Sequence, residues 1–144
     1  INSRVYPIGR LDYDTSGLLI LTNDGEITYT LTHPKHNIPK TYIAEVDKIP
    51  SGGDILKFNK GLVIDGYKTA PAKLYIIEKY EKGAKLKIIN HDGRNRQVRK
   101  MCKKIGCNVL KLKRISIGKI EIGKLKKGEY RFLSDKEINY LKGL

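Results

Sequence analysis

The stretch from residue 6 to residue 25 carries more information than any other part of this chain. It reads Tyr6-Pro7-Ile8-Gly9-Arg10-Leu11-Asp12-Tyr13-Asp14-Thr15-Ser16-Gly17-Leu18-Leu19-Ile20-Leu21-Thr22-Asn23-Asp24-Gly25. Arg10 and Asp12 stand two residues apart, and residues two apart share one face of an extended segment. We therefore expect a cation and a carboxylate to point the same way, just ahead of the apolar run from Leu18 to Leu21.

Short strands and short helices follow along the rest of the chain. Alternation and turn signals predict strands at 18–22, 41–46, 71–80, 84–90, 109–117 and 119–122, with a hairpin turn at 81–83. Helices are predicted at 26–32, 51–58, 96–105 and 134–141, the last two from an apolar stripe and a capping box. Because strands outnumber helices and hairpins join several of them, we expect an α+β fold with a mostly antiparallel sheet flanked by short helices.

Length and composition are those of one globular domain. The chain has 144 residues, of which 40% are hydrophobic, enough for a single core. No apolar run approaches the ~18 residues of a membrane helix, and no signal peptide is visible. We expect a cytoplasmic protein with no membrane partner. The first residue falls inside a pattern, which suggests a fragment of a longer chain.

The residues that commonly bind metals are sparse. Cys102 and Cys107 do not form the paired C-x-x-C units of a zinc ribbon, and we expect them to be core thiols in a reducing compartment. His33, His36 and His91 fall in loops or turns. We therefore predict no metal site.

Basic residues are concentrated in the last third of the chain. The chain has 29 Lys and Arg against 15 Asp and Glu, a formal net charge of +14. Residues 1–34 carry a net −2, whereas residues 91–131 carry a net +11. The arginines Arg94, Arg96, Arg99 and Arg114 cluster in this second region. Arginine is favoured in phosphate and base contacts, and a concentrated basic face is typical of proteins that bind polyanions. The distribution favours a nucleic-acid partner, the alternative being an ordinary Lys-rich surface.

Four segments, in order and spanning nearly the whole chain, resemble bacterial ribosomal RNA pseudouridine synthases of the Rsu type. The resemblance implies the pseudouridine synthase fold, with a mixed and mostly antiparallel sheet. The four segments are Gly9-Arg10-Leu11-Asp12 with the Thr-Ser-Gly and apolar run after it, Lys40-Thr41-Tyr42, residues 93–101 (Gly-Arg-Asn-Arg-Gln-Val-Arg-Lys-Met), and residues 109–131 with Val109 to Ile115, Gly118 and Leu125 to Arg131.

The resemblance also implies roles for individual residues. Asp12 would be the catalytic carboxylate that breaks and remakes the bond between ribose and uracil. Arg99 would be the cation that pairs with it in a desolvated pocket. Arg10 would fill the place that the flipped uridine leaves in the RNA. Tyr42 would stack on the uracil, and its hydroxyl could take the proton from C5.

The implied partner is ribosomal RNA, with the target uridine single-stranded or flipped out of a structured region, and we expect the protein to act as a monomer. The reaction has no net redox or hydrolytic step, so no cofactor and no metal is expected. The predicted RNA contacts are Arg10, Lys40, Arg94, Arg96, Lys100, Lys111, Lys113 and Arg114.

Details of the motifs indicate which ribosomal RNA is modified and which part of the family's architecture the chain contains. Small-subunit enzymes tend to have Tyr-His-Gln-Val-Lys where this chain has Asn-Arg-Gln-Val-Arg at 95–99, so a uridine in 23S rRNA is favoured over one in 16S rRNA. The N-terminal S4 domain of the family and its Lys-Pro-x-Gly segment are not in the chain. We expect residues 1–144 to be an N-terminally truncated catalytic domain.

Other interpretations of the same residues remain open. A basic rRNA-binding module without catalysis would keep the charge but would have no use for Asp12. A hydrolase would need a second carboxylate about 5–9 Å from the first, and Asp14 is expected to be a turn or capping residue instead. In a purely structural interpretation, Arg10 and Asp12 form a surface ion pair, Tyr42 is a buried aromatic and Arg99 is a solvated helix residue.

Overall fold

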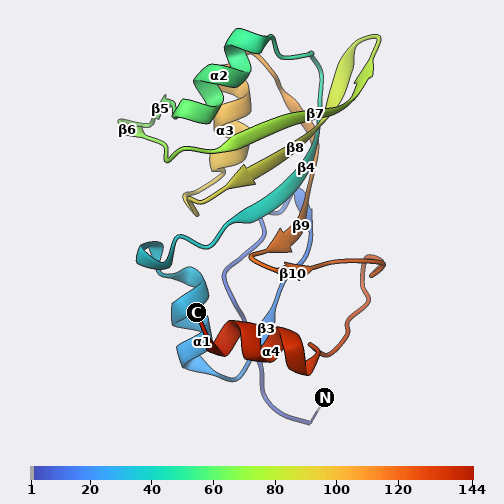
Figure 1. The fold of residues 1–144 in the computed structure, drawn as a ribbon. Coiled ribbons are helices and arrows are strands. Elements are labelled where there is room, and N and C mark those ends of the chain that lie inside the picture. The colour runs from blue at the N-terminus through green and yellow to red at the C-terminus, as the bar shows by residue number, and fades with distance from the viewer. Residues whose placement is uncertain (1) are drawn as a thin grey trace.

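The computed structural model describes residues 2–144, and a six-stranded mixed sheet organises the chain (Figure 1). The central strand β4 pairs antiparallel with β8 on one side and β9 on the other. The strand β7 continues the sheet beyond β8, β10 pairs antiparallel with β9, and β2 pairs parallel with β9. The bounds are β2 Thr15–Gly17, β4 Lys40–Val46, β7 Lys73–Tyr80, β8 Gly83–Asn90, β9 Val109–Ile117 and β10 Ile120–Glu121.

Helices and two small two-stranded sheets surround this sheet, which confirms the predicted α+β class. The remaining elements are β1 (Tyr6–Pro7) with β3 (Leu21–Thr22), β5 (Val63–Ile64) with β6 (Tyr67–Lys68), α1 (Gly25–Thr32), the 3-10 helix η1 (Pro34–His36), α2 (Gly52–Lys60), α3 (Gln97–Lys104) and α4 (Asp135–Lys142). Among residues 2–144, no helix combines the length and the apolar character that crossing a membrane requires.

Side-chain chemistry at the helix ends explains why several helices begin where they do. The carboxylate of Asp24 accepts hydrogen bonds from the first turn of α1. Ser51 opens α2 and Ser134 opens α4, each with a complete capping box in which the third residue of the helix bonds back to the cap. These bonds satisfy backbone N–H groups that have no partner inside the helix. The predicted starts of these helices are therefore confirmed to within a residue or two.

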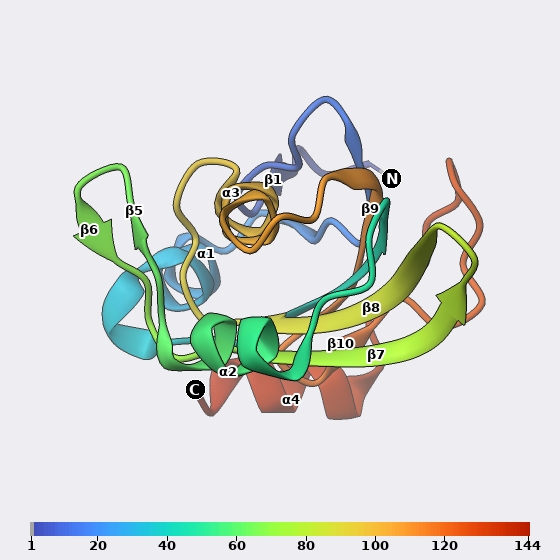
Figure 2. The same cartoon turned by 90° about the horizontal axis from the view of Figure 1, so that it is seen from above.

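Two hydrophobic cores form. The helices α2 and α3 of the first core lie above the helices α1 and α4 of the second in Figure 1. In the first core, Phe58 of α2 and Met101 of α3 pack with Leu86 and the other inward residues of the sheet. Figure 2 shows α3 inside the curve that β7, β8, β4 and β9 describe. In the second core, Leu31 of α1 and Leu141 of α4 pack with the N-terminal segment and the end of β9.

The predicted buried strand at 18–22 is wrong in its extent. Strand pairing occurs only before it, in β2, and at its end, in β3. Between them the chain changes partners, because Leu18 N–H donates to the carbonyl of Arg114 and the carbonyl of Ile20 accepts from Ile8 N–H. Leu18 and Ile20 are buried while Leu19 is 38% exposed. The apolar run therefore packs on one side only, as a bridge between β9 and β1.

Glycine is required where β2 meets β9. Gly17 has φ +116°, and a Cβ atom there would lie 2.1 Å from the carbonyl oxygen of Arg114. A side chain would clash with β9 and strain the backbone. The small Thr-Ser-Gly strand thereby anchors the segment that carries Asp12 directly onto β9.

The structure also differs from the prediction at the β5–β6 hairpin and at the start of α3. The hairpin of β5 and β6 was not predicted, although its turn residues Asp65 and Gly66 are a typical hairpin signal and both have positive φ. The helix expected at 96–105 begins at Gln97, because Arg96 adopts a left-handed backbone with φ 52°. Arg96 therefore precedes α3, and its side chain does not follow the helical spacing of residues 97–104.

Candidate active site

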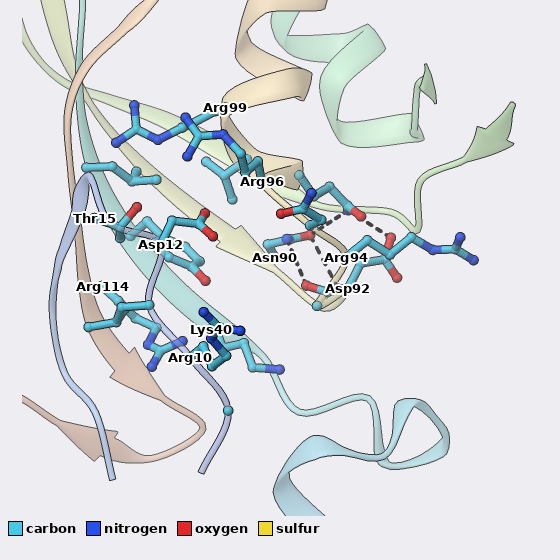
Figure 3. A pocket seen from close by; sticks show the side chains of 18 of the residues that line it. Arg10, Asp12, Thr15, Lys40, Asn90, Asp92, Arg94, Arg96, Arg99 and Arg114 are labelled. Atoms are coloured by element: carbon cyan, nitrogen blue, oxygen red, sulfur yellow. Dashed lines mark hydrogen bonds between the residues drawn. The ribbon is translucent and has the colours of Figure 1, made fainter. Parts of the chain in front are cut away.

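A cavity of about 730 Å³ lies where the two cores meet (Figure 3). Ile8, Leu31 and Ile117 line it from the second core. Val98 and Leu112 line it from the first core. Eight of the eleven site residues expected from the sequence lie on its wall: Arg10, Asp12, Lys40, Tyr42, Arg94, Arg96, Arg99 and Arg114.

Asp12 occupies the middle of this constellation. The carbonyl of Asp12 accepts a 2.9 Å hydrogen bond from Thr15 N–H, which closes a tight turn over residues 12–15. Figure 3 shows the Asp12 carboxylate with Arg96 and Arg99 on one side, and with the cations of Arg10, Lys40 and Arg114 on the other. The expectation that Arg10 and Asp12 face the same space agrees with this placement, since both line the cavity.

The expected ion pair between Asp12 and Arg99 is not present. Within residues 2–144, no salt bridge within 4.0 Å involves Asp12. Arg99 instead lies against Asp14, with its Nε 3.4 Å from Oδ1 and its Nη2 donating to the backbone carbonyl of Asp14. The turn is the physical reason, because it brings both the carboxylate and the carbonyl of residue 14 to α3.

Asp14 was expected to be a turn or capping residue, and it does occupy the turn, but it also holds two arginines. Arg96 donates from Nη1 and Nη2 to the two carboxylate oxygens, each at 2.8 Å. This bidentate pair, opposed in part by burial and helped by Arg99, lowers the pKa of Asp14 to about 2. The same bonds raise the pKa of Arg96. No local pattern indicated this pairing, because 82 residues separate the partners.

Two buried polar atoms on the cavity wall have no hydrogen-bond partner among the described residues. They are Oγ1 of Thr15 and Nε of Arg99. The 3.4 Å approach of Arg99 Nε to Asp14 is an ionic contact, because it does not meet hydrogen-bonding geometry. Buried polar groups are normally satisfied, so these two atoms are exceptions in the wall of the cavity. Thr15 was not singled out from the sequence, although it lies in the Thr-Ser-Gly element.

The strand β4 places Lys40 and Tyr42 on the cavity side of the sheet. They stand two residues apart, and Tyr42 pairs across the sheet with Arg114 of β9. Burial, together with repulsion from Arg114, lowers the pKa of Lys40. Tyr42 is half-buried and packs against the first core. Its ring therefore forms an apolar wall of the cavity.

Arg114 is almost fully buried and has a defined partner. Its Nε and Nη2 both donate to the carbonyl of Leu18, at 2.9 and 2.8 Å. These bonds tie β9 to the N-terminal segment, immediately after the close approach of Gly17. Arg114 therefore supports the wall of the cavity from behind, in addition to adding positive charge to it.

A network of polar side chains holds the loop between β8 and α3. Gln97 donates to Asp92 at 2.9 Å and accepts from the hydroxyl of Tyr67 at 3.0 Å. Arg94 stacks over the ring of Tyr67, with 3.9 Å between its Cζ and the ring centroid. The β5–β6 hairpin thus positions the arginine-bearing loop, a contact that sequence reasoning missed along with the hairpin itself.

Three of the expected RNA contacts lie outside the cavity. Lys100 is 2.6 Å from the carboxylate of Asp65 on the β5–β6 hairpin. Lys111 and Lys113 alternate along β9 with Leu112 and Arg114, so they lie on the opposite face of the sheet. Contact of these lysines with RNA would therefore involve another part of the substrate than the nucleotide in the cavity.

No group of three or more His, Cys, Asp or Glu side chains in residues 2–144 is arranged to hold a metal ion. The cavity is lined by guanidinium groups, one ammonium group, the rings of Tyr13 and Tyr42, and the carboxylates of Asp12 and Asp92. Asp92 already accepts hydrogen bonds from Gln97 and from Ala70 N–H, which leaves the Asp12 carboxylate facing the cavity. Such a set can bind a polyanion and place a single carboxylate against one nucleotide.

Comparison with known proteins shows which family has this arrangement. Residues 1–104 match the family described as RNA pseudouridylate synthase. The chain belongs to that family. The resemblance seen in the four sequence segments is confirmed, and the matched residues include every one of the eight expected side chains on the cavity wall except Arg114.

The relatives and solved structures agree with the family match. The chain is 46% identical to ribosomal large subunit pseudouridine synthase B of Bacillus subtilis, over 100% of this chain and 60% of the relative. It is 39% identical to ribosomal large subunit pseudouridine synthase E of Vibrio parahaemolyticus, over 88% and 59%. A crystal structure of a pseudouridylate synthase superposes with a TM-score of 0.88 at 34% identity, over 95% of this chain and 59% of that one. The chain therefore spans about three fifths of these proteins.

Proposed function

We propose that residues 1–144 form the catalytic domain of an enzyme that converts a specific uridine of ribosomal RNA to pseudouridine, with Asp12 as the catalytic carboxylate. The observation that carries this proposal is the position of Asp12, inside a cavity of about 730 Å³ and without an ion-pair partner, between two groups of cations. A binding module for RNA would gain nothing from a carboxylate at the centre of its basic cavity.

The reaction breaks the C1′–N1 bond of uridine, rotates the uracil and forms a C1′–C5 bond, while C5 loses a proton and N1 gains one. One carboxylate can serve as nucleophile or base in this sequence. Asp12 is the carboxylate in reach, since Asp14 is held in the bidentate pair with Arg96. Asp92, the other carboxylate on the cavity wall, is held by hydrogen bonds from Gln97 and from Ala70 N–H. Arg96 and Arg99 would stabilise charge that develops near Asp12. Tyr42 would stack on the uracil and receive the C5 proton.

Access to the base requires that the uridine leave the RNA stack, which costs about a few kcal/mol. Arg10 lies on the cavity wall and would occupy the vacated position. Lys40, Arg94 and Arg96 lie on the same wall and would bind the flanking phosphates. Lys100, Lys111 and Lys113 would contact more distant parts of the RNA.

The large-subunit rRNA is the substrate we favour over 16S rRNA. The Asn-Arg-Gln-Val-Arg segment at 95–99 supports this choice. So do the names of the relatives in Bacillus subtilis and Vibrio parahaemolyticus, both of which are large-subunit synthases.

The test uses 23S and 16S rRNA transcripts that carry tritium at C5 of uracil. We expect the protein to release tritium from 23S rRNA, and the isosteric variant Asp12→Asn to release none. Asp135→Asn, which changes a carboxylate on α4 away from the cavity, is the matched control and should keep full activity.

The outcomes separate the competing functions. Tritium release by Asp12→Asn at the normal rate would show that Asp12 is not the catalytic group. Absence of release by the unmodified protein, with tight binding of both RNAs, would establish the binding module instead. Free uracil among the products would establish a hydrolase.

A further inference from the structure

Tyr13 is an aromatic side chain in an unusual position. It is 94% exposed, the largest value among the exposed large hydrophobic residues that the structure describes. Within residues 2–144 it is also the only one of those exposed residues that lines the cavity. The ring of Tyr13 belongs to neither hydrophobic core. The chemistry proposed for Asp12 does not require this ring.

The turn over residues 12–15 explains how Tyr13 comes to lie at the cavity rim. Tyr13 and Asp14 are the two central residues of the turn, which the hydrogen bond from Thr15 N–H to the carbonyl of Asp12 closes. Asp12 points into the cavity and Asp14 binds the arginines of the α3 region. Tyr13 is left on the outer side, one residue from the catalytic carboxylate.

The ring of Tyr13 also has a fixed cationic neighbour. The Cζ atom of Arg96 lies 5.5 Å from the ring centroid, within the range of a cation–π contact. Arg96 cannot easily move away, because both of its terminal nitrogens are bonded to Asp14 at 2.8 Å. The turn therefore presents an exposed aromatic face beside a guanidinium group that is already oriented.

We propose that Tyr13 and Arg96 form a stacking site for the base of a nucleotide that flanks the target uridine. The inference rests on the proposed function, since it assumes that the target base occupies the cavity next to Asp12. The neighbouring nucleotide then remains at the rim, where Tyr13 is the exposed aromatic surface. Aromatic rings and arginine planes are the surfaces on which unstacked bases are bound. Every base has a π-face, so the site would accept any base at that position.

This site would offset part of the cost of flipping. The base beside the flipped uridine loses one stacking partner in the RNA, and Tyr13 would replace it. A site built in this way recognises an aromatic base rather than a phosphate. Its contribution should therefore disappear when that base alone is removed from the RNA.

The experiment measures dissociation constants for an RNA oligonucleotide with the target uridine and for two versions that are abasic at the 5′ or the 3′ neighbour. All proteins carry Asp12→Asn, so that the RNA is not converted. We expect Tyr13→Ala to weaken binding of the complete RNA by roughly fivefold to 100-fold, the range of one base–aromatic stack. Tyr13→Phe should bind within about twofold of the parent, because its ring is retained.

The decisive comparison is between the RNAs. On one of the two abasic RNAs, the parent and Tyr13→Ala should bind equally. Tyr6→Ala is the matched control, since Tyr6 is 52% exposed and has Arg4 over its ring at 5.3 Å, but it does not line the cavity. It should bind like the parent.

Two results would overturn the inference: no loss of affinity in Tyr13→Ala, or the same loss on the complete RNA and on both abasic RNAs. Either result leaves the proposed function intact if the protein with Asp12 restored still releases tritium. Absence of tritium release would refute the proposed function, whatever the binding data show.

Discussion

Three consecutive residues of one turn have three different surroundings. Asp12 enters the cavity, Tyr13 lies in solvent at its rim, and Asp14 binds Arg96 and Arg99. A tight turn changes the chain direction within a few residues, so neighbouring side chains cannot share one face. Arg10 and Asp12 do face the same space, as alternation along an extended segment predicts. Alternation does not describe the turn that follows them.

Asp14 should affect catalysis through the arginines that it holds. Replacing Asp14 with Asn keeps the shape but removes the charge that orients Arg96, and misplaced groups near a reacting centre cost about tenfold to 100-fold in rate. We expect the kcat for tritium release to fall by that factor, with a smaller change in KM. In a double-mutant cycle, Arg96→Gln should cause little further loss once Asp14→Asn is present. Additive losses would show that the two residues act independently.

The contribution of Asp14 to the free energy of unfolding should be lost in acid. Its pKa is about 2 in the folded protein, below the ordinary value of 3.8, because of the hydrogen bonds from Arg96. The contribution is therefore complete above about pH 4 and is lost as the pH falls toward 2. In urea unfolding, the difference between the parent and Asp14→Asn should be constant above pH 4 and shrink below it. A difference that grows with acid would contradict the assignment.

At the scale of elements, β9 joins the parts of the molecule. It pairs with β4, β10 and β2, and the guanidinium of Arg114 reaches back to the carbonyl of Leu18. One face of the strand lines the cavity with Leu112 and Arg114. The other face presents Lys111 and Lys113 to solvent. The alternation of a strand thus separates the cavity wall from a basic outer surface.

The outer surface of β9 should contribute to RNA binding through charge alone. Replacing Lys111 and Lys113 with Ala should weaken binding and reduce the slope of log Kd against log salt by about 0.7 for each lost contact with a single-stranded phosphate. The kcat at saturating RNA should not change, because neither side chain lines the cavity. Lys136→Ala with Lys142→Ala on α4 is the charge-matched control. An unchanged slope would mean that the two lysines of β9 do not contact the backbone of the RNA.

At the scale of the whole molecule, the cavity depends on both cores. Its walls come from the N-terminal segment, β4, the loop before α3, and β9, which belong partly to the first core and partly to the second. The acidic turn lies in the first 34 residues, and four of the five arginines on the cavity wall lie after residue 91. Folding therefore brings a net negative segment of the chain against a strongly positive one.

A substitution deep in the first core should test whether the two cores unfold together. Phe58 is fully buried, and removing such a side chain costs about 3–5 kcal/mol. We expect Phe58→Ala to lower the free energy of unfolding by that amount while leaving a single transition in urea. The transition should be the same by far-UV and near-UV circular dichroism. Two separate transitions would show that the cores are independent units.

Much of this protein could be determined from the sequence alone. The helices α1, α2 and α4 were predicted because apolar spacing, breakers and capping residues are local signals. The hairpin of β7 and β8 was predicted because its turn and alternation are also local. The family could be recognised because its motifs are contiguous. Eight cavity residues followed from the same motifs.

Only the tertiary structure decided which charges meet. Arg99 pairs with Asp14 instead of Asp12, across 85 residues of sequence. Lys111 and Lys113 lie behind the sheet, although Arg114 beside them lines the cavity. The physical reason is that pairing energy depends on distance and direction in space, and a turn of four residues or a switch of strand partner sets both. Local sequence determines the elements, whereas their packing determines which side chain each charge can reach.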